Sequence, residues 1–193
     1  MAESSQGPET SLTRVRYDPE SVANVGVFKN RFVLPIRAYE EEGKEFIVVR
    51  LTVRGNEALR EVCHTADQKE VWRFPSYEFV VRKDSLSVAQ VSGSFYRTRI
   101  GLIELEIRTA RPSYVNALLI ASRGLPQHFS CTNNTRTMFV EDVRLPGYWG
   151  GSCAGCKWKD HGAQCSFADR DEAKYHPTDL ASLPRGVIEE VED

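Results

Sequence analysis

The chain has 193 residues, a formal net charge of −2 at pH 7, and 41% hydrophobic and 27% charged side chains. This length suits one domain or two small domains with a buried core. The near-neutral charge excludes a general electrostatic attraction to nucleic acid or to an anionic membrane, so such binding would need a local patch.

The first residues, 1–13, are small and polar and include Pro8, which predicts a disordered arm. They lack the basic and apolar segments of a secretory signal, and no apolar run reaches the roughly 20 residues that span a bilayer. We therefore expect an intracellular protein of the nucleus or cytoplasm with no membrane contact. Its thiols would be reduced there, which favours metal binding over disulfides.

Residues 14–111 have the pattern of a β-rich domain. Two apolar, β-branched segments at 31–37 and 45–53 are separated by a charged loop at 40–44, which predicts an antiparallel hairpin. Pro35 lies inside the first segment and indicates an edge strand or a bulge, because proline has no N–H to donate.

Two more strands and one helix are predicted in this domain. Segments 77–82 and 100–108 have strand patterns, and the second alternates apolar with charged residues. Asn56 is predicted to be the N-cap of a short helix over residues 57–63, because its side chain can accept a hydrogen bond from a free backbone N–H.

A longer helix is predicted over residues 113–123. Apolar residues recur there at helical spacing, Pro112 is suited to the first turn, and Gly124 is suited to the end. This helix begins a predicted zinc-binding, Cys-rich lobe of residues 112–170. A partly helical tail with an acidic end is predicted at 171–193. The expected fold is thus α+β, with an antiparallel β-rich body before the small lobe.

Cysteines in the predicted lobe have the spacing of a metal site. Cys153-Ala-Gly-Cys156 is a CxxC turn that places two sulfurs together, and Cys165 follows as a third ligand. Cys131 and His161 compete for the fourth position, and we rank Cys131 ahead. These residue types predict one tetrahedral Zn²⁺ ion.

The segment from Tyr114 to Phe167 resembles a fungal cysteine-rich domain of unknown function. The segments that carry the resemblance are Asn116-Ala-Leu-Leu-Ile120, Ser130-Cys131, Thr137-Met-Phe139, Ser152-Cys153-Ala-Gly-Cys156 and Cys165-Ser-Phe167. That family is similar to the binuclear zinc clusters of fungal transcription factors. By this resemblance, Asn134 and Asp142 stand where two ligand cysteines would be, which implies one zinc ion and makes Asp142 an alternative ligand.

Aromatic and basic residues near the cysteines are candidates for binding a partner. Trp158 lies between Lys157 and Lys159, so its ring could stack on an unpaired base, or it could cover the zinc site. With Tyr148 and Trp149, it could instead form a protein-binding surface. One basic patch is predicted from Arg97, Arg99, Arg108, Arg111 and Arg123.

No catalytic motif is visible in the sequence. Cys63 and His64 are neighbours, and we interpret Cys63 as a core cysteine at a helix end, because adjacent helical residues do not face each other. The sequence therefore predicts a non-enzymatic, zinc-stabilised protein-interaction module. The resemblance implies a fungal nuclear, transcription-associated assembly. The alternative is a zinc-knuckle-like protein that binds single-stranded or non-specific nucleic acid.

Overall fold

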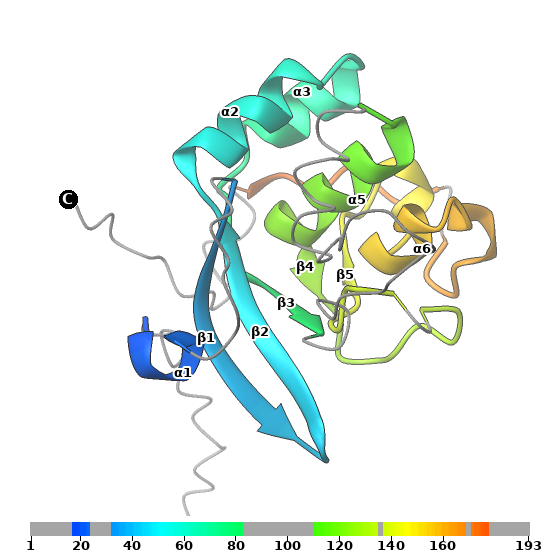
Figure 1. Cartoon of the computed structure of the whole chain (residues 1–193). Coiled ribbons are helices and arrows are strands. Elements are labelled where there is room, and N and C mark those ends of the chain that lie inside the picture. Colours follow the sequence, from blue (N-terminus) through cyan, green and yellow to red (C-terminus); the bar gives the residue numbers. More distant parts are fainter. Residues whose placement is uncertain (1–16, 24–31, 83–109, 135–136, 169–170, 178–193) are drawn as a thin grey trace, which may run out of the picture.

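The computed structural model describes a three-stranded antiparallel sheet packed beside helices, with a cysteine-rich lobe after them (Figure 1). The described residues are 17–23, 32–82, 110–134, 137–168 and 171–177. The predicted α+β fold is confirmed. The predicted disordered arm, the strand at 100–108 and the acidic end of the tail lie outside the described residues. Within these residues, no helix is long and apolar enough to cross a membrane.

The sheet contains β1 (Val33–Glu41), β2 (Lys44–Leu51) and β3 (Phe79–Arg82), in that order. β1 and β2 form the predicted hairpin, which is confirmed. Their register shifts between Pro35 and Arg37, on a strand at the edge of the described sheet. This irregularity confirms the predicted effect of Pro35 and follows from its missing N–H.

The middle strand β2 is buried on both of its faces. Ile47 and Val49 point into the main core, while Phe46 and Val48 belong to a second cluster on the opposite face. The alternation follows from the two-residue period of a strand. Four consecutive buried residues therefore fix β2 between two apolar layers.

The first helix after the hairpin differs from the prediction. α2 spans Val53–Glu61, and its N-cap is Thr52, whose side chain accepts a hydrogen bond from the Gly55 N–H at 3.0 Å. The prediction that Asn56 caps this helix was wrong. Thr52 ends the extended segment directly after β2, so its hydroxyl reaches the first turn before Asn56 can. A short α1 (Pro19–Ala23) packs beside β1.

A further helix, α3 (Ala66–Trp72), was not predicted. Its sequence signal is a capping box, in which Thr65 accepts from the Gln68 N–H and the Gln68 side chain accepts from the Thr65 N–H. Gln68 is buried and also donates to Asn116 Oδ1 at 2.8 Å, which joins α3 to the helix that contains Asn116.

The central helix α5 (Pro112–Arg123) begins and ends as predicted, with Gly124 as the C-cap. It is buried on nearly all sides, as expected for a helix in the middle of a core. The main core combines Val49 from the sheet, Leu119 from α5 and Tyr148 from the Cys-rich segment. The predicted boundary between a β-rich domain and a Cys-rich lobe stays a prediction, and the apolar core is continuous across it.

The Cys-rich segment is built from short elements. It contains a two-stranded pair, two 3₁₀ helices and one short α-helix. These are β4 (Leu125–Pro126), β5 (Val143–Arg144), η2 (Trp149–Gly151), α6 (Ala154–Trp158) and η3 (Gly162–Gln164). α6 packs against α5, so the lobe is seated on the main core (Figure 1).

Candidate metal centre

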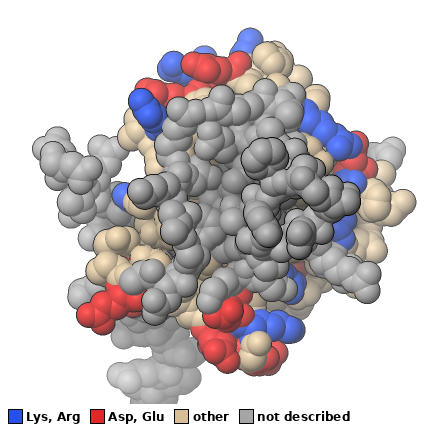
Figure 2. Space-filling view, in the orientation of Figure 1, with Lys and Arg blue, Asp and Glu red and all other residues tan. Residues whose placement is uncertain are grey.

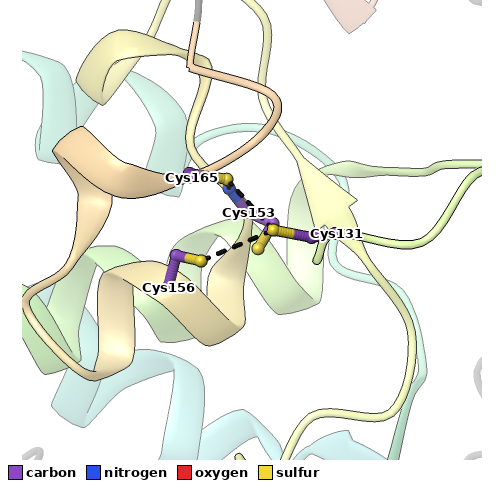
Figure 3. Close-up of side chains that lie close together, drawn as sticks. All are labelled: Cys131, Cys153, Cys156 and Cys165. Atoms are coloured by element: carbon purple, nitrogen blue, oxygen red, sulfur yellow. Dashed lines mark hydrogen bonds between the residues drawn. The ribbon is translucent and has the colours of Figure 1, made fainter. Parts of the chain in front are cut away.

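Four cysteine side chains converge where the short elements of the lobe meet (Figure 3). Cys131 lies in the loop between β4 and β5, Cys153 is the N-cap of α6, Cys156 lies within α6, and Cys165 follows η3. Their Sγ atoms all lie within 4.8 Å of one another, and all four residues are buried. The four cysteines could therefore hold a metal ion.

The sulfur separations suit a single tetrahedral ion. Cys131 Sγ lies 3.6 Å from Cys156 Sγ and 3.7 Å from Cys165 Sγ. For a metal–sulfur bond of about 2.3 Å, two sulfurs at the corners of a tetrahedron lie about 3.8 Å apart. These separations thus fit the edges of one four-sulfur site.

A tight turn brings Cys153 to this position. Trp149, Gly150 and Gly151 have φ of 49°, 72° and 67°, which is the left-handed region. A side chain at Gly151 would also crowd the carbonyl oxygen of Phe167. The turn leaves the Cys153 N–H free to donate to Cys165 Sγ at 3.3 Å.

The thiols strongly influence one another's ionisation. Hydrogen bonds from Cys153 and Cys156 lower the pKa of the Cys165 thiol, although burial opposes this. The pKa of Cys153 is raised by its hydrogen bonds to Cys156 and Cys165 and by burial. Thiolates this close repel one another, so a bound cation is needed before all four can be ionised together.

The alternative ligands lie outside the cluster. His161 is exposed, and its backbone N–H donates to the Cys156 carbonyl oxygen at 2.9 Å. Asp142 accepts hydrogen bonds from the Cys131 N–H at 2.8 Å and from Asn134 Nδ2 at 2.6 Å. The structure thus brings Cys131 to the other three cysteines, while Asp142 contacts the cluster through the backbone of Cys131.

Trp158 packs on the core and not over the sulfurs. Its ring lies 4.4 Å from the Tyr114 ring and 5.6 Å from the Phe139 ring, measured between centroids. Phe167 is the aromatic residue that packs against the four cysteines. The sequence signal for this role was its position, two residues after Cys165.

The other predicted partner-binding residues differ in how far they are exposed to solvent. Tyr148 is 1% exposed and meets Phe74 edge to face in the core, so its predicted place on a partner surface is corrected. Trp149 is half-buried against the same core. Lys157 and Lys159 remain partly exposed on either side of Trp158.

The predicted basic patch does not form from its described members. Arg123 is 2% exposed and donates hydrogen bonds to Asn56 Oδ1 at 2.8 Å and to the Trp72 carbonyl oxygen at 3.2 Å. Burial lowers its pKa to about 10. Arg111 pairs with Asp160 at 3.2 Å. The other predicted members, Arg97, Arg99 and Arg108, lie outside the described residues.

Cys63 is separate from the cluster. It is buried in the main core, and its Sγ donates to the Leu59 carbonyl oxygen at 3.1 Å. Burial raises the pKa of this thiol to about 11. This placement confirms the prediction of a core cysteine.

The fold and the site define an α+β protein with a candidate four-cysteine metal centre. Residues 117–168, which include all four cysteines, match a family described as a protein of unknown function (DUF3716). This match supports the predicted resemblance to a domain of unknown function. The fungal source and the likeness to binuclear zinc clusters stay predictions. No curated protein and no solved structure matches the chain.

Proposed function

We propose that the chain is a non-enzymatic protein-interaction module stabilised by one Zn²⁺ ion on Cys131, Cys153, Cys156 and Cys165. The observation that carries this proposal is the buried set of four sulfurs within 4.8 Å of one another. Structural zinc sites use four protein ligands, whereas catalytic zinc sites leave one position for water or substrate. Four cysteines fill every position.

The donor set favours zinc over other metals. Thiolates select zinc, iron or copper(I) over magnesium and calcium, and a tetrahedral four-sulfur geometry is typical of zinc or iron. The 4.8 Å limit on sulfur separations leaves room for one ion among the ligands, which disfavours a cluster of several iron atoms.

The ion would contribute directly to folding of the lobe. α6 has five residues, and β4 and β5 have two residues each. Elements this short are not stable alone. The conformational entropy lost in nucleating a helix or pairing two short strands exceeds the energy gained from the few hydrogen bonds that form. One ion bound to Cys131, to the Cys153–Cys156 turn and to Cys165 would join three separate segments.

An exposed phenylalanine supports the interaction role. Phe129 is 80% exposed, the highest value among the exposed large hydrophobic residues of the described ranges. It lies two residues before Cys131, so the ion would anchor the loop that presents it. An aromatic side chain on an anchored loop is suited to fill a pocket of a protein partner.

Nucleic-acid binding is less well supported. Contacts with the Tyr114 and Phe139 rings already occupy part of the Trp158 ring surface, which leaves less of it for stacking on a base. On the face shown in Figure 2, acidic side chains lie beside basic ones around the margin of the described surface. Phosphate contacts need several cations together, and on the coloured part of this face the basic side chains have acidic neighbours.

Elemental analysis of the purified full chain tests the metal site. We expect about one zinc ion per chain in the wild type, the same in Cys63→Ser, and a large loss in Cys131→Ser. Cys63→Ser is the matched control, because it also removes a buried thiol. A metal-free wild type, or full zinc content in Cys131→Ser, would contradict the proposed site.

The interaction role has its own test. Proteins captured from a cell lysate by the wild type should be lost with Phe129→Ala, while the zinc content of the variant stays unchanged.

The nucleic-acid alternative is tested by fluorescence anisotropy. A labelled single-stranded oligonucleotide should show no binding to the full chain at low salt. Tight, salt-sensitive binding that Trp158→Ala abolishes would favour the nucleic-acid alternative instead.

A further inference from the structure

Two polar side chains connect the Cys131 segment to the rest of the metal centre. One oxygen of Asp142 accepts from the Cys131 N–H at 2.8 Å, and the other accepts from Asn134 Nδ2 at 2.6 Å. Asn134 Oδ1 accepts from the Thr137 hydroxyl at 2.5 Å, and the Asn134 N–H donates to the Cys131 carbonyl oxygen at 3.1 Å. The Asp142 carboxylate thus holds the backbone N–H of Cys131, the Asn134 backbone N–H holds the Cys131 carbonyl oxygen, and the Asn134 side chain holds the Asp142 carboxylate in place.

The amide of Asn134 also touches the CxxC turn. A Cβ atom built on Gly155 would overlap Asn134 Oδ1 and Cγ. Gly155 lies between Cys153 and Cys156, inside the turn that supplies two of the four sulfurs. The missing side chain at Gly155 is therefore what lets Asn134 lie against this turn.

We infer that Asp142 and Asn134 are positioning residues that set the metal affinity of the site. They hold Cys131 against the Cys153–Cys156 turn before an ion binds. This inference rests on the proposed metal site. Bringing distant chain segments together costs entropy, and a site that is already assembled avoids that cost when the ion binds. Loss of such supporting residues typically lowers metal affinity by 10- to 100-fold.

The hydrogen bonds also explain why Asp142 is not itself placed as a ligand. Each of its oxygens already accepts from a neighbour, one from the Cys131 N–H and one from Asn134. Turning an oxygen toward the sulfurs would break one of these bonds and leave a half-buried donor without its acceptor, which is unfavourable. Asp142 therefore acts on the ion through Cys131.

Zinc competition with a coloured chelator, on the full chain, tests the inference. We expect Asp142→Asn and Asn134→Ala each to lower zinc affinity at least tenfold. Asp160→Asn, which makes the same charge change at an exposed site in the lobe, should leave the affinity unchanged. Cobalt(II) spectra should keep the four-sulfur signature in Asp142→Asn and lose it in Cys131→Ser, because only the second variant removes a ligand.

The overlap at Gly155 provides a sharper test. Gly155→Ala should lower zinc affinity by at least 100-fold, because its methyl group would displace Asn134. In the double variant Gly155→Ala/Asn134→Ala the displaced group is gone, so the affinity should recover to that of Asn134→Ala alone. If the zinc affinity of the double variant fell by the product of the two single-variant losses, the two side chains would act independently. That result would overturn the inference.

The outcomes separate this inference from the proposed function. A wild type that binds one zinc ion, with unchanged affinities in Asp142→Asn and Asn134→Ala, would refute the positioning role and leave the site intact. A wild type that binds no zinc would refute the proposed function itself. If Gly155→Ala does not fold, the Asp142→Asn and Asn134→Ala measurements still decide the question.

Discussion

In the sheet, β2 has eight residues and buries four of them in a row, whereas the longest described element of the Cys-rich segment after α5 is α6, with five residues. Both regions contribute to one main core through α5. The sheet has its own second apolar layer around Phe46 and Val48, and the lobe has the four cysteines in the corresponding role. We infer that apolar burial stabilises the first region and that metal–sulfur bonds stabilise the second.

Removing the metal should produce the largest effect and test this comparison directly. We expect a strong chelator to increase hydrogen exchange across residues 131–167 by orders of magnitude, with a much smaller change in β2. Hydrogen-exchange mass spectrometry with and without chelator measures both regions at once. Equal loss of protection in β2 would show that the lobe and the sheet unfold as a single unit.

Replacing the buried arginine between the regions should have the next largest effect. Arg123→Met removes donors from Asn56 Oδ1 and the Trp72 carbonyl oxygen, both of which lie in partly buried positions. We expect a loss of about 2–3 kcal/mol in the free energy of unfolding. Urea unfolding measures this loss, and zinc content should not change. A variant as stable as the wild type would show that these acceptors find other partners.

Removing the N-cap of α2 should lower the stability of the sheet region and leave the Cys-rich segment unaffected. Thr52→Ala deletes the side chain that accepts from the Gly55 N–H, and we expect a cost of about 1 kcal/mol. Thermal unfolding of the purified protein is the measurement, and Thr52→Ser, which keeps an accepting hydroxyl at the cap position, serves as the control. Lower zinc affinity in Thr52→Ala would argue that the two regions are more tightly coupled than proposed.

At neutral pH the smallest expected effect is the titration of Cys63, which changes stability only in alkaline solution. Burial raises the pKa of this thiol from 9.0 to about 11, so the folded protein retains a proton that the unfolded chain releases. Its contribution to stability is therefore complete below pH 9 and is lost as the pH rises through about 11. We expect the difference in melting temperature between the wild type and Cys63→Ser to change only in that alkaline range. If this difference in melting temperature changed near neutral pH, the pH dependence could not be assigned to the Cys63 thiol.

Helices and strands could be predicted where neighbouring residues in the sequence have a characteristic pattern. The β1–β2 hairpin has two β-branched segments and a charged loop, and α5 has Pro112 and Gly124 at its ends. α3 was missed although the capping box of Thr65 and Gln68 marks its start. The helix cap at Thr52 was misplaced because Asn56 is an equally good capping residue by type.

The metal centre could be predicted only where its ligands are close in sequence. The CxxC spacing indicated Cys153 and Cys156 directly, but the fourth ligand depends on how the loop after α5 folds back. The local spacing only ranked Cys131 ahead of His161 and could not decide between them. The same limit hid the contact of Asn134 with Gly155 and the packing of Phe167, in place of Trp158, against the cysteines.

The order of the four cysteines along the chain matters during synthesis. All of them follow residue 130, so the three sheet strands have left the ribosome before an ion has a complete place to bind. Under the proposal of a zinc site, a cell short of zinc would accumulate molecules in which the Cys-rich segment, and the part of the main core that it supplies, stay incomplete. Proteases degrade such partly folded chains, so the amount of this protein in the cell should follow the zinc supply.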